Sequence, residues 1–407
     1  MKGSGTIFFR RWYTSIDRRS MFLLILLIVF GMIFSPTATM PFAVKRNMPY
    51  LLYAKHHIVM AFLAIVIILI TTLLHEEQVK FLMTLGYMLC LCAMLLTFVA
   101  GVEIKGARRW IKVFGLSIQP SEFLKPTMSV VSAYFLSKQY DVTSGYLSKS
   151  SNQVPLYLRP LSRFFVVRDN SFDRSGVAKK TRNNNIAPYI FLSCVFVFLS
   201  VFMLLIQPDF GMALLLIICY FSQLFIAGIS LASVFMMLFG SGCFACLSYV
   251  FLPHVRSRVD TFLFGDQEAS YQISKALQAI RSGGFFGKGA GNGTIKQTIP
   301  DMHADFVLSV MSEEFGIISC LVIFTIFLVI TTRAMIRVLE TRNMFKILIV
   351  FGLSIQILAQ VFVSFGSSMG IIPTKGITLP FFSYGGSSVL SAAISFGLIM
   401  CFTKSAQ

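Results

Sequence analysis

The stretch IPDMHADFVLSVMSEEFG, residues 299–316, decides the fold, because it joins a polar, glycine-rich segment to an apolar run long enough to cross a membrane. Its first positions carry Asp301, His303 and Asp305, and Glu313 and Glu314 follow inside the apolar run. Ionisable side chains at a membrane boundary are costly, so they are functional candidates by default. The rest of the chain is expected to be a membrane body that presents these groups at its surface.

The composition around this stretch is that of a membrane protein. Of the 407 residues, 56% are hydrophobic and 13% are charged, whereas a soluble protein carries about a quarter of charged residues. The apolar runs are continuous, which favours helices over a β-barrel. We predict an all-α, polytopic membrane protein, a single domain over residues 1–407 with about ten transmembrane helices. The expected spans are 21–39, 57–75, 80–99, 121–138, 187–206, 210–228, 231–252, 303–332, 344–364 and 383–403.

An even number of spans places both termini on one side of the membrane. The basic residues before the first span, Arg10, Arg11, Arg18 and Arg19, predict that this side is the cytoplasm. Segment 139–186 is then a basic cytoplasmic loop, and segment 253–302 is a large extracytoplasmic loop between the seventh and eighth helices. Residues 273–280 of the outer loop have the spacing of an amphipathic helix. The glycines of SGGFFGKGAGNG, 282–293, predict turns and close approach of backbones.

The formal net charge of +18 is spread over many loops, which argues against a nucleic-acid partner. The positive-inside rule and anionic lipid head groups explain part of it. The outer loop 100–120 breaks that rule with Lys105, Arg108, Arg109 and Lys112. An anionic substrate at the outer face would explain this excess, and anionic lipids are the alternative. The cysteines lie in or beside apolar runs, so we expect no disulfide framework.

The first cluster of candidate substrate-binding residues lies just before the fourth span and in its first turns. An arginine fork suits a diphosphate, and a tryptophan suits a sugar face or the membrane interface. Ser121 can cap the fourth helix, and an internal ion pair is the alternative role for Glu122 and Lys125. The cluster consists of Arg108, Arg109, Trp110, Lys112, Ser121, Glu122 and Lys125.

Two further clusters are expected on the same side. Gln207 and Asp209 lie between the fifth and sixth spans, where Asp209 could be no more than a helix cap. The segment GIIPTKGITLPFFSYGGSS, 370–388, has an irregular backbone, which is tolerated at membrane depth only where protein buries it or where it lines a cavity. The remaining predicted substrate-binding residues are Lys288, His303, Lys375, Ser383, Tyr384, Gly385 and Ser387.

Asp305 is the candidate catalytic residue. A carboxylate at the mouth of a span is partly desolvated, which raises its pKa and makes it a better base. Asp301 competes for this role, because residues four apart share one face of a helix. An ion pair with a basic group of the outer loops is the alternative for Asp305.

These stretches together resemble the SEDS family of bacterial shape, elongation, division and sporulation proteins, over about the whole chain. The matching stretches are GARRWI with IQPSEFLKP, QPDFG, YQISKALQAIRSGGFFGKG, HADF with EEFG, and PTKGITLPFFSYGGSS. PTKGITLP is more similar to the cell-division member of the family than to the elongation member. The departures are Ala304, where Thr is usual, and Asp301, where Glu is common.

The resemblance implies a peptidoglycan glycosyltransferase that polymerises lipid II at the outer face of the bacterial cytoplasmic membrane during septal cell-wall synthesis. Asp305 matches the aspartate of the family's HTDF motif and would be the general base on the 4-hydroxyl of the acceptor sugar. Arg109 and Lys375 would stabilise the departing undecaprenyl diphosphate. The implied partners are a class B penicillin-binding protein and other divisome membrane proteins. No tightly bound cofactor is expected, and a divalent cation, Mg²⁺ or Mn²⁺, stays compatible with the sequence.

Two other functions fit the same membrane body. Charged residues within the spans fit a transporter that flips lipid II, although no inverted repeat is visible. The basic loop 139–186 fits a division scaffold without chemistry. Loss of Asp305 separates the three, because only the enzyme requires its carboxylate.

Overall fold

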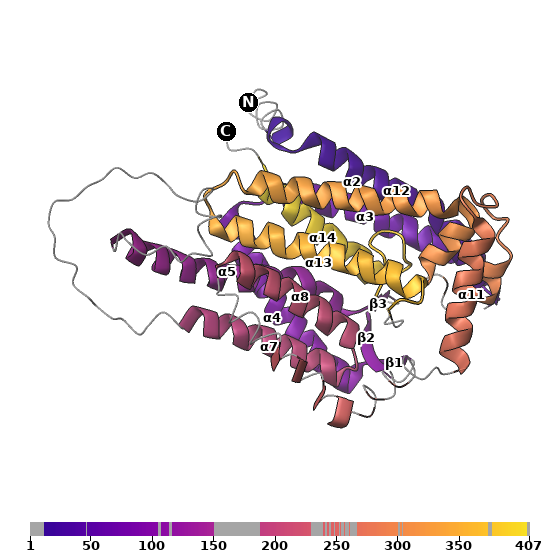
Figure 1. Ribbon diagram of the computed structural model, residues 1–407, viewed down its shortest axis with the longest axis horizontal. Coiled ribbons are helices and arrows are strands. Elements are labelled where there is room, and N and C mark those ends of the chain that lie inside the picture. Colours follow the sequence, from indigo (N-terminus) through magenta and orange to yellow (C-terminus); the bar gives the residue numbers. More distant parts are fainter. Residues whose placement is uncertain are drawn as a thin grey trace.

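The long apolar runs form helices that lie side by side in one bundle (Figure 1). The computed structural model describes residues 12–45, 47–104, 107–113, 116–149, 188–228, scattered positions in 239–260, and residues 267–299, 302, 304–372 and 377–404. Within these residues, six helices are long and apolar enough to span a membrane. They are α2 (Arg18–Lys45), α3 (Leu52–Leu73), α4 (Glu76–Ala100), α7 (Pro188–Ile206), α12 (Val307–Val338) and α13 (Met344–Ser368).

Three more helices complete the described part of the bundle. The apolar helices α8 (Phe210–Ile226) and α14 (Gly386–Phe402) are shorter, and α5 (Pro120–Lys149) is long but more polar. Helix α5 contacts α4, α7, α8, α13 and α14, and α13 contacts α8, α12 and α14, so α5 and α13 form the centre. Helix α5 continues past the predicted end of its span at residue 138. The predicted span 231–252 lies largely outside the described residues.

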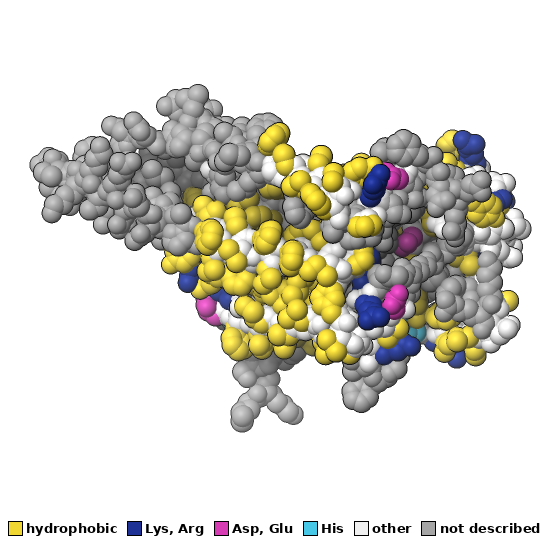
Figure 2. Space-filling model, turned by 90° about the horizontal axis from the view of Figure 1, so that it is seen from below, with side chains coloured by type: hydrophobic (Ala, Val, Ile, Leu, Met, Phe, Trp, Pro, Cys, Tyr) yellow, Lys and Arg dark blue, Asp and Glu magenta, His cyan; other side chains and the backbone are white. Residues whose placement is uncertain are grey.

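The outer helices present a hydrophobic surface of the kind that lipid covers. Large side chains such as Phe62, Phe81 and Phe198 are exposed on it. Figure 2 shows a broad hydrophobic face with Lys, Arg, Asp and Glu side chains toward its two ends. An exposed apolar band of this extent is too costly in water, so the fold is that of a multi-pass membrane protein, as the sequence predicted.

The two ends of the bundle differ. At one end, Asp17 before α2 pairs with Arg333 of α12, and Lys404 after α14 donates a hydrogen bond to the carbonyl of Thr72 in α3. We call this the terminal end. The opposite end carries a small sheet, helix α11 (Gln267–Gly283) and the segment that leads to α12 (Figure 1), and we call it the loop end.

A small three-stranded antiparallel sheet, which the sequence analysis did not predict, occupies part of 100–120. Strand β1 (Val102–Ile104) pairs with β2 (Ala107–Val113), and β2 pairs with β3 (Leu116–Ile118). The register places Glu103 opposite Arg108, so a cross-strand charge pair supports the hairpin. Strand β2 packs on α4 and α5, and β3 packs on α14. The sheet thereby fixes the basic outer segment against the helices.

The predicted amphipathic helix is α11, and it packs on α12. The glycine-rich segment that follows bonds to α12 through its backbone. Gly287 lies so close that a Cβ there would be 2.2 Å from the Glu314 carbonyl oxygen. Helix α12 is broken at Gly316, whose φ of 79° favours glycine. The prediction of close backbone approach in 282–293 is therefore confirmed.

Candidate active site at the loop end

Around the break at Gly316, backbone groups of α12 form hydrogen bonds with the glycine-rich segment. The amides of Lys288 and Gly289 donate to the carbonyls of Glu313 and Glu314, at 3.0 and 2.9 Å. In return, the amide of Ile317 donates to the Gly284 carbonyl at 3.0 Å. Groups that an unbroken helix would use internally thus hold the segment in place.

The two glutamates of EEFG complete this connection with their side chains. Glu313 is fully buried, and its carboxylate accepts hydrogen bonds from the amides of Thr294, Ile295 and Lys296 at 2.8–2.9 Å. Glu314 is also buried and pairs with the ammonium of Lys296. That ammonium also donates to the Thr37 carbonyl of α2 at 3.2 Å. The two acids therefore have a structural role, which separates them from the acids that precede α12.

Asp305 lies in a turn just before α12, partly exposed, and not on the helix. The expectation that it shares a helix face with residue 301 is wrong for this reason, because the helix begins only at Val307. The preceding carbonyl, of Ala304, accepts a 2.7 Å hydrogen bond from the hydroxyl of Ser383. Ser383 accepts in turn from the amide of Leu379 at 2.9 Å. Asp301 and His303 lie outside the described residues.

Ser383 belongs to the predicted third cluster, and the structure brings this cluster to the Asp305 turn. Tyr384 Oη lies 3.4 Å from His56 Nδ1 of α3, and its ring meets that of Tyr53 edge to face at 5.2 Å. Gly385 precedes the first residue of α14. The SYGG segment therefore joins α3, α14 and the Asp305 turn, while Lys375 lies outside the described residues.

Arg109 has structural partners for its guanidinium group. It is 9% exposed, and its Nε donates to the Gln207 carbonyl at 2.9 Å while Nη2 donates to the Pro208 carbonyl. Its Nη1 lies 3.6 Å from Oδ2 of Asp209, which caps α8. Gln207 itself donates to Thr97 Oγ1 of α4 at 2.5 Å. The first two predicted clusters thus meet, and Arg109 joins β2 to the turn between α7 and α8.

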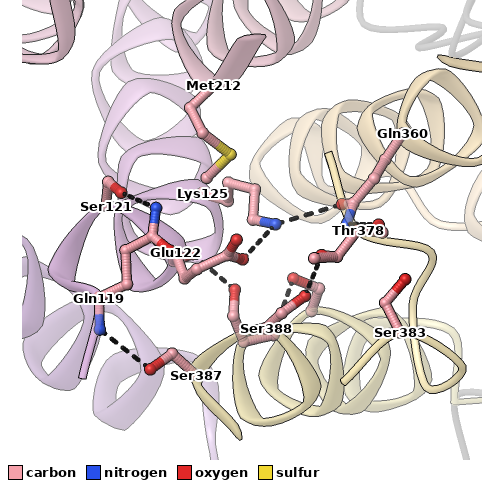
Figure 3. Close-up of polar contacts among 12 residues, drawn as sticks. Gln119, Ser121, Glu122, Lys125, Met212, Gln360, Thr378, Ser383, Ser387 and Ser388 are labelled. Carbon is pink, nitrogen blue, oxygen red and sulfur yellow. Dashed lines mark hydrogen bonds and ion pairs between the residues drawn. The ribbon is translucent and has the colours of Figure 1, made fainter. Parts of the chain in front are cut away.

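Figure 3 shows a chain of polar groups that runs from α5 through α13 to α14. Lys125 Nζ lies 2.7 Å from Glu122 Oε2 and donates to Gln360 Oε1 at 3.2 Å. Gln360 donates to the Thr378 carbonyl at 2.7 Å, and the Thr378 hydroxyl shares a hydrogen bond with that of Ser388. The Glu122–Lys125 ion pair, expected as one alternative, is therefore present, and it is buried among the central helices.

The other predicted residues divide between bonded and solvent-facing groups. Ser121 accepts from Gln119 Nε2, and Ser387 accepts from the Gln119 amide, both at 3.0 Å. Lys288 Nζ lies 3.6 Å from Glu313 Oε1. Exposed Arg108 pairs with Glu103 at 3.3 Å, Trp110 is half-buried and Lys112 is exposed.

Sequence reasoning missed several residues that hold the site together. They are Lys296, Gln360, Thr378 and Ser391, whose hydroxyl donates to the Glu122 carbonyl at 2.6 Å. A polar residue within an apolar run was a usable signal for Gln360 and Ser391. No local signal marked Lys296, because its acidic partner lies 18 positions away.

These features define a class: a multi-pass helical membrane protein with a partly exposed carboxylate at one end, held by buried polar networks. A family model described as a cell cycle protein, covering FtsW, RodA and SpoVE, matches residues 18–407. The chain belongs to this family, which confirms the resemblance seen in the sequence.

Relatives and solved structures agree with this assignment. A protein of Caulobacter vibrioides named probable peptidoglycan glycosyltransferase FtsW is 29% identical over 397 residues, covering 97% of this chain and 90% of the relative. A Francisella salina protein of the same name is 30% identical, with coverage of 95% and 87%. A chain of a peptidoglycan synthase complex has a TM-score of 0.70 at 21% identity and covers 96% of this chain and 98% of its own. Thermus thermophilus RodA has a TM-score of 0.61 at 21% identity, with coverage of 96% and 97%.

Proposed function

We propose that this protein is a peptidoglycan glycosyltransferase that polymerises lipid II, with Asp305 as general base. One observation carries the proposal: among the described carboxylates of residues 299–316, Asp305 is partly exposed, whereas Glu313 and Glu314 are buried. The names of the relatives support the same enzyme class.

The proposed reaction uses the Asp305 carboxylate for one proton transfer. It accepts the proton of the acceptor's 4-hydroxyl while that oxygen bonds to the anomeric carbon of the growing strand. The bond from this carbon to the lipid diphosphate breaks, and the diphosphate leaves as an anion. The bonds around Ala304 and Ser383 fix the turn, so the base is held in position before substrate arrives.

The leaving diphosphate requires cations that are accessible. Lys112 on β2 is exposed, whereas Arg109 is buried and bonded to the α7–α8 turn. We therefore assign diphosphate stabilisation to Lys112, together with Lys375 as the sequence predicts, and we give Arg109 the role of holding the α7–α8 turn.

We further propose that the terminal end faces the cytoplasm and that the loop end faces outward, in the cytoplasmic membrane at the division septum. Basic residues at the terminal end, such as Arg18, Arg19 and Arg342, support this orientation. A class B penicillin-binding protein is the proposed partner, because a similar fold occurs in a complex that coordinates polymerization and crosslinking. The predicted loops 139–186 and 253–302 would lie on the inner and outer sides.

A metal requirement stays a prediction. Within the described residues no three His, Cys, Asp or Glu side chains lie together as a metal cluster. Asp301 and His303, the titratable residues nearest to Asp305 in sequence, lie outside that part of the chain. An assay with and without Mg²⁺ or Mn²⁺ addresses this point directly.

The decisive experiment measures polymerisation of labelled lipid II by the purified chain with its transpeptidase partner. We expect Asp305→Asn to lower the rate by about 10²–10⁴-fold, the range for loss of a general base, with unchanged thermal stability. Glu103→Gln is the matched control, because it removes an exposed carboxylate from the same end. Equal rates for Asp305→Asn and Glu103→Gln would refute the assignment of Asp305.

The buried Glu122–Lys125 pair is the observation that keeps lipid II transport as the second candidate. A vesicle assay of lipid II movement separates the two functions. If the wild-type protein makes no glycan, and Asp305→Asn still moves lipid II across the vesicle membrane, the protein is a flippase and the glycosyltransferase proposal is refuted.

A further inference from the structure

A cavity of about 1100 Å³ opens at the terminal end, far from the Asp305 turn. Its walls come from the starts of α4 and α13, from the middle of α5, and from the ends of α12 and α14. Tyr134 and Phe345 supply aromatic walls, and the Lys80 ammonium lies 4.8 Å from the centre of the Phe345 ring. The cavity therefore sits where the spans end, at the depth of lipid head groups.

The cavity is strongly basic. Two acidic side chains, Glu76 and Glu340, face six basic ones: Lys80, Lys138, Arg337, Arg342, Lys346 and Lys404. Three of the six have carboxylate partners. Lys80 lies 2.9 Å from Glu76 and 2.8 Å from Glu77, Lys346 lies 3.9 Å from Glu76, and Arg337 lies 3.3 Å from Asp17.

The other three basic groups have no such partner. Among the side chains that the structure describes, which do not include those of 141–150, no carboxylate lies within ion-pair distance of Lys138, Arg342 or Lys404. The Lys138 ammonium lies 4.5 Å from the centre of the Tyr134 ring. Burial lowers the pKa of Lys404 below its usual value, and the nearby charge of Lys346 acts in the same direction. Cations gathered without counter-charges repel one another, and an anion in the cavity would relieve that repulsion.

We propose that this cavity binds a phosphate-bearing anion, with Lys138, Arg342 and Lys404 as its ligands. Ammonium and guanidinium groups both bind phosphate oxygens, and the guanidinium does so through two parallel hydrogen bonds. Two sources supply this chemistry: the head group of an anionic phospholipid and a soluble phosphate compound. The position at the ends of the spans favours the lipid. The inference is independent of the proposed glycosyl transfer.

The test uses the full-length chain and native mass spectrometry to measure phosphatidylglycerol retained from mixtures with phosphatidylcholine. A second arm measures thermal stabilisation by inorganic pyrophosphate in lipid-free detergent, with ionic strength held constant by chloride. The cavity variant is Arg342→Gln with Lys404→Gln. The matched control, Arg18→Gln with Arg19→Gln, removes the same charge from the first two residues of α2, which are both exposed.

We expect the cavity variant to retain phosphatidylglycerol about 25-fold more weakly than wild type, because each of the two basic groups at head-group depth contributes roughly five-fold. The control should stay near wild type. If only the cavity variant loses stabilisation by pyrophosphate, and all variants retain phosphatidylglycerol equally, the ligand is a soluble phosphate compound. This outcome also supports the site. If the cavity variant and the control behave alike in both arms, the proposal is overturned. Should the double variant not fold, the exposed single variant Arg342→Gln carries the same test with an expected loss of about five-fold.

Discussion

The two ends of the bundle carry positive charge in different ways. At the loop end, Arg109, Lys296 and Lys288 lie against carboxylates or carbonyls of neighbouring segments, so their charge holds loops in shape. At the terminal end, Lys138 and Arg342 line an open cavity, and no carboxylate among the described side chains pairs with them. The comparison teaches that the sign of charge does not locate a ligand. The presence or absence of an internal partner is more informative.

The largest loss of stability that would test this comparison is expected when Glu313 is substituted. Glu313→Ala leaves three amides without their acceptor, that of Lys296 buried and the other two partly buried, and each unpaired buried group costs on the order of 1–3 kcal/mol. We therefore expect a loss of about 3–5 kcal/mol in the free energy of unfolding, together with faster proteolysis within 284–298. Chemical denaturation in detergent and limited proteolysis measure the two effects.

Glu340→Ala is the control for this change, because Glu340 is an exposed acid in the turn between α12 and α13. Its effect should stay within about 0.5 kcal/mol. If both variants are equally stable, the Glu313 carboxylate does not hold the segment, and the contrast between the two ends loses its main support.

A smaller loss of stability is expected when Arg109 is substituted, and none is expected when Lys112 is substituted. Arg109→Lys cannot reproduce the fork that reaches the Gln207 and Pro208 carbonyls, so we expect about 1–3 kcal/mol of lost stability. Lys112→Gln should leave stability unchanged and raise the KM for lipid II. Unfolding curves and steady-state polymerisation measure these outcomes. A raised KM with full stability in Arg109→Lys would show instead that Arg109 contacts the diphosphate.

The smallest effect is expected at Asp17 of the terminal end. Burial opposes the shift, but the hydrogen bond from Ser20 and the charges of Arg337 and Arg333 together lower the pKa of Asp17 below its usual value. A lowered carboxyl pKa stabilises the fold above the unfolded value of about 4, and this contribution is lost as the pH falls through the folded pKa.

Asp17→Asn should therefore cost about 1 kcal/mol at neutral pH and progressively less in acid. Melting curves of both proteins between neutral and acid pH measure the difference. A difference that stays constant with pH would mean that the variant disturbs packing and that the ion pairs contribute nothing.

The sequence was sufficient to predict the helical membrane fold, because most of the spans are continuous apolar runs and need no distant partner to be recognised. The sheet at 102–118 was missed, since its short strands carry charges and form only against α4, α5 and α14. The helix boundary before Asp305 was placed too early for a similar reason. The hydrogen bond between Ser383 and Ala304 joins residues 79 positions apart, and no local pattern reports it.

The candidate site could be predicted in its composition but not in its roles. An ion pair between Glu122 and Lys125 was one of two alternatives for these residues, because residues three apart are neighbours on a helix. The role of Arg109 depends on the carbonyls of Gln207 and Pro208, which the fold brings to it from 98 and 99 positions away. Backbone carbonyl acceptors cannot be recognised in a sequence. The sequence therefore does not distinguish a buried structural arginine from a substrate-binding one.

The break in α12 at Gly316 has a consequence for how this protein tolerates change. The segment from Gly284 to Gly289 bonds to α12 through main-chain groups, and the Glu313 carboxylate binds main-chain amides further along. The side chains of Phe285 and Phe286 are exposed, so we expect their substitution to have little effect on these main-chain bonds. Insertion or deletion of a single residue would shift every amide past its acceptor. The segment is therefore expected to tolerate substitutions but not changes in length. Libraries made to alter the loop end should vary its residues while keeping their number.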